Sequence, residues 1–234
     1  MIKKDIGTRM KEYEATSQTR FINQMPIIIR IDGKAFHTFT KRCMCETPFD
    51  RKLHNAMVSS MRKCMDTIMQ NAVLGYTQSD EISILLKTWP DFNTEQWFGG
   101  KQQKIVSVSA SAITAYFNKI FESSYLAMFD ARAFQMPISE VANYFIWRQQ
   151  DAERNSIQMY GRSVFSHKEL QNKSCPEIIE MLYKKDMIWK DLYPWKKRGT
   201  VISCNEVYYP RFIKERNFID SLLLDVFETN LDEV

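Results

Sequence analysis

The sequence predicts an α+β protein with a ferredoxin-like antiparallel sheet, helices on one face of that sheet, and a mainly helical C-terminal extension. Candidate elements in residues 1–136 follow the order strand, helix, strand, strand, helix, strand. The clearest strand is at residues 27–31, a mostly isoleucine run bounded by Pro26 and Gly33. Beyond Pro137 the spacing of apolar residues becomes helical.

Local signals define the other elements of residues 1–136. Residues 1–24 are predicted to form a polar helix, with Met10, Tyr13 and Phe21 as candidate packing contacts. Pro48 is expected to begin a helix that runs to about residue 71, with an apolar stripe made of Leu53, Met57, Met61, Met65 and Ile68. The remaining predictions are a loop at residues 40–48, hairpin strands at 73–76 and 82–86, a connection at 89–100, a helix at 109–121 and a strand at 126–134.

The extension, residues 137–234, is expected to pack with the first domain as one unit. Ser139 can cap a long helix that carries Val141, Tyr144, Phe145 and Trp147. The elements expected after it are a polar loop with a short helix at residues 166–174, a helix at 176–183, a basic and aromatic segment at 184–198, a returning strand at 199–209 and a final helix at 218–227.

The composition is that of a globular protein with one substantial core. Of the 234 residues, 44% are hydrophobic and 13% aromatic, which excludes a disordered chain. Lys and Arg number 32 against 28 acidic residues, so the net charge of +4 permits a nucleic-acid partner without requiring one.

The cysteines and the apolar runs indicate a cytoplasmic protein. Five cysteines, an odd number without zinc-ligand spacing, are expected to be free thiols in a reducing compartment. The N-terminus is charged with no apolar run behind it, and no stretch approaches the roughly 18 apolar residues that a membrane span needs.

Asp32 lies where the first strand ends and is followed by Gly33. A carboxylate before a glycine lets a metal ion approach the backbone, because glycine has no Cβ to block its own carbonyl. An Asp-Gly pair is also common in a turn that ends a strand, so Asp32 alone leaves both interpretations open.

A second acidic pair favours the metal-binding interpretation. Asp80 and Glu81 fall at the tip of the predicted hairpin, and two or three carboxylates converge if that hairpin lies beside the first strand. Clustered acids repel one another unless a cation neutralises them, and oxygen ligands select magnesium or manganese over zinc. The pattern therefore predicts a two-metal site for phosphoryl or nucleotidyl transfer.

Four motifs occur in a familiar order: RIDGKAFHTF at residues 30–39, GYTQSDEIS at 75–83, FDAR at 129–132 and WRQQDAERN at 147–155. Together they resemble the tRNA(His) guanylyltransferase family. NSIQMYGRSVFSHKELQNKS and KRGTVI are similar to its guanylyltransferase-like branch, whose members add nucleotides in the 3′-to-5′ direction. The resemblance covers residues 27–202 and implies a polymerase palm. Canonical polymerases and nucleotidyl cyclases share that fold, so the fold alone does not choose the reaction.

The resemblance implies a chemistry for the acidic cluster. Asp32, the Gly33 carbonyl and Asp80 would hold two Mg²⁺ ions, with Mn²⁺ as an alternative, and Glu81 would be a nearby catalytic acid. ATP would first adenylylate a 5′-monophosphorylated tRNA, and the 3′-hydroxyl of an incoming GTP or other NTP would then displace AMP. An RNA that already has a 5′-triphosphate could skip the activation.

Nucleotide contacts are expected just after the first strand, where backbone N–H groups beyond an Asp-Gly turn can cradle phosphate and a lysine can neutralise it. The candidate residues there are Gly33, Lys34, Ala35, Phe36 and His37. The resemblance supplies the role of His37, which could otherwise be a packing residue, and adds Asp50 and Ser79.

The tRNA contacts are expected in the extension, because basic residues interleaved with aromatics suit a phosphate backbone and exposed bases. The candidates are Arg148, Arg154, Asn155, Lys196, Lys197 and Arg198. A solvated helix face would explain Arg148, Arg154 and Asn155 as well. On that face, Asp151 would orient one of the two arginines. Trp189, Tyr193 and Trp195 could equally be buried aromatics.

The sequence departs from the family at two positions. Many relatives have a lysine where Thr47 stands, so its charge near the activating triphosphate is either absent here or replaced by Lys41 or Arg42. Eukaryotic relatives have a histidine at the position of Glu153, and an anion there weakens the reading of one particular anticodon.

We therefore expect template-dependent repair of 5′-truncated tRNA, and the resemblance implies a homotetramer. Addition of a single guanylate to tRNA(His) is the alternative on the same site. A nucleotidyl cyclase is disfavoured by the basic C-terminal half, and a non-catalytic RNA-binding module is disfavoured by the intact Asp32, Asp80 and Glu81.

Overall fold

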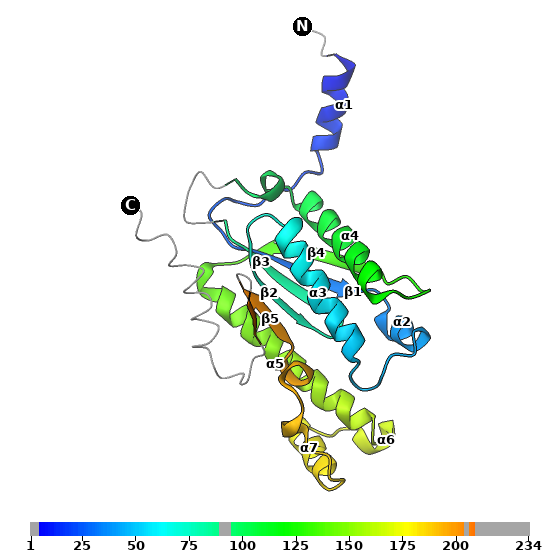
Figure 1. The fold of residues 1–234 in the computed structure, drawn as a ribbon. Coiled ribbons are helices and arrows are strands. Elements are labelled where there is room, and N and C mark those ends of the chain that lie inside the picture. Colours follow the sequence, from blue (N-terminus) through cyan, green and yellow to red (C-terminus); the bar gives the residue numbers. More distant parts are fainter. Residues whose placement is uncertain (1–4, 89–94, 204–205, 209–234) are drawn as a thin grey trace.

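The computed structural model describes residues 5–88, 95–203 and 206–208 (Figure 1). Within them, six antiparallel strands form one sheet in the order β4-β1-β3-β2-β5-β6. The strands are β1 (Ile27–Gly33), β2 (Ala72–Gln78), β3 (Glu81–Leu86), β4 (Phe129–Gln135), β5 (Thr200–Ser203) and β6 (Glu206–Tyr208). The order β4-β1-β3-β2 confirms the predicted ferredoxin-like palm.

The helices of the palm are α1 (Ile6–Ala15), α2 (Phe36–Arg42), α3 (Arg51–Thr67), the short 3₁₀ helix η1 (Trp97–Gly100) and α4 (Gln102–Phe121). Those of the extension are α5 (Ile138–Arg162), α6 (His167–Leu170), α7 (Cys175–Tyr183), the 3₁₀ helix η2 (Trp189–Asp191) and α8 (Pro194–Arg198).

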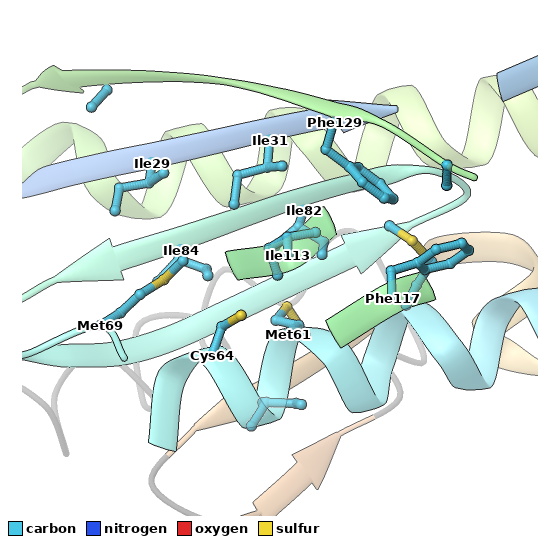
Figure 2. Close-up of a cluster of buried hydrophobic side chains, with 14 of the residues drawn as sticks. Ile29, Ile31, Met61, Cys64, Met69, Ile82, Ile84, Ile113, Phe117 and Phe129 are labelled. Atoms are coloured by element: carbon cyan, nitrogen blue, oxygen red, sulfur yellow. The ribbon is translucent and has the colours of Figure 1, made fainter. Parts of the chain in front are cut away.

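One face of the sheet packs on α3 and α4. Ile29 and Ile31 of β1 turn toward this face, because alternate residues of a strand point to opposite sides. Figure 2 shows these side chains, with Ile82 and Ile84 of β3, gathered around Met61 of α3 and Phe117 of α4. The predicted methionine stripe is therefore core at Met57 and Met61, which are fully buried.

The opposite face is covered by α5. Ile28, Leu85 and Tyr76 pack there on Val141 and Phe145. The prediction of helices on one face thus holds for α3 and α4, and the first helix of the extension makes a third layer. This explains why β1 is apolar on both faces.

The rest of the extension is attached in two ways. β5 extends the sheet beside β2. The far half of α5 packs with α6 and α7 in a separate apolar cluster, where the indole N–H of the buried Trp189 donates to the Ser156 hydroxyl at 3.0 Å.

Several local expectations were wrong. The N-terminal helix is short and projects away from the rest of the chain (Figure 1), with Met10 and Tyr13 exposed, although Phe21 packs on the core. Pro48 precedes α3, which is capped by Asp50, and Ser139 does not cap α5. The returning strand is a pair, β5 and β6.

Some expectations concern parts that the structure does not describe. The helix predicted at 218–227 and Cys204 lie outside the described residues. Of the described cysteines, Cys43, Cys45, Cys64 and Cys175 are free thiols. Among the described helices, none combines the length and the apolar character required to cross a membrane.

Candidate active site

Asp32 and Asp80 meet at one end of the sheet. Asp32 is the next-to-last residue of β1, and Asp80 lies in the two-residue turn between β2 and β3. The Gly33 N–H donates to the Asp80 carbonyl at 3.1 Å and ties the turn to β1. Glycine is required at position 33 because a Cβ there would come within 2.2 Å of the Phe36 ring.

The two carboxylates affect one another electrostatically. Burial raises the pKa of Asp80, and the negative charge of Asp32 raises it further. A cation between the two groups would relieve this repulsion. Asp32 and Asp80 therefore lie close together, as predicted. A bound cation would lower the free energy needed to ionise both carboxyl groups.

The donor set suits a magnesium ion shared with a phosphate ligand. Within the described residues, no group of three or more His, Cys, Asp or Glu side chains is placed to hold an ion by itself. Mg²⁺ usually binds one or two carboxylates and completes its shell with water and substrate phosphates. Asp32, Asp80 and the Gly33 carbonyl fit that type of site.

Glu81 points into a different network. Its Oε2 lies 2.6 Å from Arg30 Nη2, and its Oε1 lies 2.8 Å from Arg148 Nε. The second pair is an ion pair without the geometry of a hydrogen bond. Burial raises the pKa of Glu81, and the charges of Arg148 and Arg30 oppose that rise. Glu81 thus links the sheet to α5, and both its oxygens are engaged by arginines.

Arg148 cannot serve as the predicted RNA contact. It is 5% exposed and also binds Asp151 at 2.6 Å, while Asp151 in turn contacts Arg154. The expectation that Asp151 orients an arginine holds for both of them. Removing one partner of such a buried pair leaves an uncompensated charge, so this network fixes where α5 lies.

Two hollows meet at Asp80. The larger has a volume of about 820 Å³ and lies between α2, the loop before α3 and the end of α5. The smaller, of about 420 Å³, lies between Asp32 and α5. The residues common to both linings are Ser79, Asp80, Met159 and Arg162. The larger hollow is within the size range of small-ligand sites.

The α5 wall of the smaller hollow was missed by sequence reasoning. Its polar residues are Asp151, Asn155, Gln158 and Arg162. Their spacing of four, three and four residues is a signal that could have identified one face of a helix. Of the four, only Asp151 and Asn155 are expected from the sequence.

The predicted phosphate cradle is only partly available. The N–H groups of Gly33 and Lys34 already donate to the carbonyls of Asp80 and Met128. Ala35 has a left-handed backbone and caps α2, the Phe36 ring is buried among other phenylalanines, and His37 is exposed and lines the larger hollow.

The two other nucleotide candidates lie at the larger hollow. Asp50 accepts the N–H groups of Leu53 and Glu46 at 2.7 and 2.8 Å, so its carboxylate organises the loop before α3. The hydroxyl of Ser79 donates to Asp80 at 3.1 Å.

The structure distinguishes Lys41 from Arg42 as a replacement for the lysine that relatives have at the position of Thr47. Lys41 and Thr47 both line the larger hollow. Arg42 does not belong to either lining, and its guanidinium lies over the Tyr125 ring instead. Lys41 is therefore the residue whose charge faces this hollow.

The basic segment of α8 lines neither hollow. Lys196 lies over the rings of Phe49 and Trp195, and Lys197 donates to the Lys190 carbonyl. Arg198 contacts Glu153 at 3.2 Å with a side chain only 12% exposed, which corrects its assignment as an RNA contact.

The three aromatic residues singled out in this segment differ in their exposure. Trp189 is buried, Tyr193 is 70% exposed, and Trp195 stacks on the buried His54 with ring centroids 4.3 Å apart. Burial lowers the pKa of His54 to about 4, so this ring is neutral at pH 7.

Comparisons with known proteins identify relatives in sequence and in fold. A bacterial tRNA(His) guanylyltransferase-like protein, solved in complex with ATP, is 41% identical and superposes with a TM-score of 0.87 over 93% of this chain and 99% of that one. An uncharacterised protein of Acanthamoeba polyphaga mimivirus is 27% identical over 97% of this chain and 85% of its own length. The tRNA(His) guanylyltransferase of Schizosaccharomyces pombe is 34% identical over 63% of this chain and 56% of its own length, so this chain spans about half of that enzyme.

The family model described as tRNAHis guanylyltransferase matches residues 7–137, which is more than half of the 234 residues. The matched segment contains both Asp32 and Asp80 and the strands that bring them together. The chain belongs to the tRNA(His) guanylyltransferase family.

Proposed function

We propose that this protein is a magnesium-dependent nucleotidyltransferase that adds nucleotides to the 5′ end of tRNA in the 3′-to-5′ direction, and that it repairs 5′-truncated tRNA. The observation that carries the proposal is the position of Asp32 and Asp80 beside two adjoining hollows. One hollow can hold a nucleotide while the other admits a second substrate, as a transfer between two phosphorylated molecules requires.

Asp32, Asp80 and the Gly33 carbonyl are the groups that would hold Mg²⁺. Bound ions of this kind lower the pKa of an attacking hydroxyl and stabilise a leaving pyrophosphate. The larger hollow would hold the activating ATP, with Lys41 and His37 near its phosphates. The bacterial relative was solved in complex with ATP, which supports ATP as a ligand of this protein.

The reaction would proceed in two displacements. In the first, an oxygen of the 5′-monophosphate of the tRNA attacks the α-phosphorus of ATP, and pyrophosphate leaves. In the second, the 3′-oxygen of the incoming NTP forms a bond to the 5′-phosphorus of the tRNA, its proton is released, and AMP leaves. No covalent bond to the protein is needed.

Repair is favoured by the surroundings of Glu153. Its carboxylate binds Arg198 and so joins α5 to α8. A histidine ring that contacts RNA from this position would instead have to point outward. With base pairing to the opposite strand choosing each nucleotide, the protein needs only backbone contacts. Arg154, with a side chain 66% exposed, Asn155, Lys196 and Lys197 are the basic or polar candidates for such contacts.

Guanylate addition to tRNA(His) is the second candidate, because the Schizosaccharomyces pombe relative carries that name. It would use the same carboxylates. The two activities differ in whether the tRNA template or the enzyme selects the nucleotide.

Replacing either metal-binding carboxylate should abolish nucleotide addition without unfolding the protein. We expect Asp32→Ala and Asp80→Asn to lower the rate by at least about 100-fold, because the first removes a metal ligand and the second removes the negative charge of one. Asp66→Ala, at an exposed position near the end of α3, is the matched control. Rates are measured with 5′-truncated tRNA and thermal unfolding is followed in parallel. Substantial activity in either variant would refute the metal assignment.

Lys41→Ala should weaken activation by ATP, whereas Arg42→Ala should have a much smaller effect. Of these two residues, only Lys41 lines the larger hollow, and the charge of Arg42 is directed to Tyr125. The measurement is the dependence of 5′-adenylylation on ATP concentration. RNA with a 5′-triphosphate is the internal control, because it skips this step. Equal effects of the two substitutions would contradict the assignment.

Competition between two RNAs should distinguish repair from guanylate addition. We expect a 5′-truncated non-histidine tRNA to be used at least as well as full-length tRNA(His), with incorporation following the opposing base. The assay contains Mg²⁺, ATP and each labelled NTP in turn. Exclusive guanylate addition to tRNA(His), dependent on its anticodon, would overturn the repair proposal.

The assembly is proposed to be a homotetramer, as the family resemblance implies. Light scattering should then give about four times the chain mass of 27.7 kDa. A mass near that of one chain at micromolar concentration would contradict the tetramer.

A further inference from the structure

Arg162 stands where the two hollows meet. It lies in the last turn of α5, is exposed, and lines both hollows together with Asp80. Two other basic side chains, His37 and Lys41, line only the larger hollow, and Arg30 lines only the smaller one. Arg30 is already bound to Glu81. Among the described residues, Arg162 is thus the basic side chain that the two linings share.

This position matters because both displacements take place at the same carboxylates. The phosphorus under attack must lie near Asp32 and Asp80 in each step, whichever hollow holds the nucleotide. Negative charge accumulates on its oxygens, and a guanidinium can donate two hydrogen bonds to them. A cation on the wall shared by both hollows can serve both steps.

The helix that carries Arg162 is held firmly. Arg148, about four turns earlier on α5, is buried and bound to Glu81 at the end of the sheet, and Gly161 packs on Ile178. The last turn of α5 is therefore positioned relative to Asp80 by contacts that do not involve Arg162. The backbone that carries Arg162 is thus in place before a substrate binds, which favours a role in stabilising charge.

We propose that Arg162 is a phosphate-binding residue that contacts the phosphoryl group under attack in both steps. The inference rests on the proposed function, in which ATP and the tRNA 5′-phosphate supply the reacting groups. Arg162 forms and breaks no bond itself. It stabilises charge while pyrophosphate leaves in the first step and AMP leaves in the second.

A purely structural role is the competing explanation, because a cation in the last turn of a helix stabilises the helix dipole. Arg162→Lys keeps that charge and loses the planar fork, whereas Arg162→Gln loses both. Lys119→Ala is the matched control, since it removes one positive charge from the last turn of α4, and Lys119 lines neither hollow.

The steps are assayed separately with the full chain. Adenylylation is measured on 5′-monophosphorylated truncated tRNA with ATP, and transfer is measured on the same tRNA with a 5′-triphosphate. We expect Arg162→Gln to slow both steps by about 100-fold, Arg162→Lys to be intermediate, and Lys119→Ala to match the unmodified chain. Wild-type rates in Arg162→Gln would overturn the proposal, and so would an effect on one step alone. If Arg162→Gln lowers the unfolding midpoint, Arg162→Lys decides the question, and its full activity would then refute the contact.

A binding measurement separates this inference from the proposed function. Inorganic tripolyphosphate with Mg²⁺ is titrated into each variant, and we expect about tenfold weaker binding to Arg162→Gln. If the unmodified chain adds no nucleotide but binds tripolyphosphate through Arg162, the proposed function fails and the phosphate contact stands. Equal tripolyphosphate binding by all variants would refute the contact.

Discussion

The ion pairs of Glu81 with Arg30 and Arg148 are the interaction on which the arrangement of the site depends. They connect the end of the sheet to α5 in a largely buried position, where a missing partner would leave a charge without compensation. Because Glu81 directly follows Asp80, the same short turn carries a metal-binding candidate on one side and the anchor of α5 on the other. Under the proposed function, the adjacent acidic residues Asp80 and Glu81 thus have two different tasks.

The sheet divides these tasks through the alternation of its side chains. Ile29 and Ile31 enter the core beneath α3 and α4, whereas Arg30 and Asp32 lie on the face covered by α5. The apolar half of β1 therefore supports the fold, and its polar half builds the smaller hollow. Gly33 ends this alternation where the Phe36 ring occupies the space of a side chain. The requirement for glycine at position 33 is thus one of packing as well as of access to its carbonyl.

Some basic residues of the extension make contacts within the protein that hold its helices in place. Arg198 and Glu153 join α8 to α5, and the Tyr76 hydroxyl of β2 donates to the Arg198 carbonyl at 2.9 Å. These contacts use basic residues that a reader of the sequence would assign to RNA. Charge clusters near aromatics are compatible with both roles, and only the burial of each side chain distinguishes them.

The sequence by itself determined the palm, the strand that ends in Asp32, the hairpin that carries Asp80, and the family. These features depend on local alternation, on turn chemistry and on motifs that are continuous in the chain. The tertiary structure decided which charges are available: it buried Arg148, paired Arg198 with Glu153, turned Arg42 toward Tyr125 and placed Arg162 with Asp80 in the linings of both hollows. These outcomes depend on the packing of α5 against a sheet formed by distant segments, and the spacing of residues within any one segment does not encode that contact.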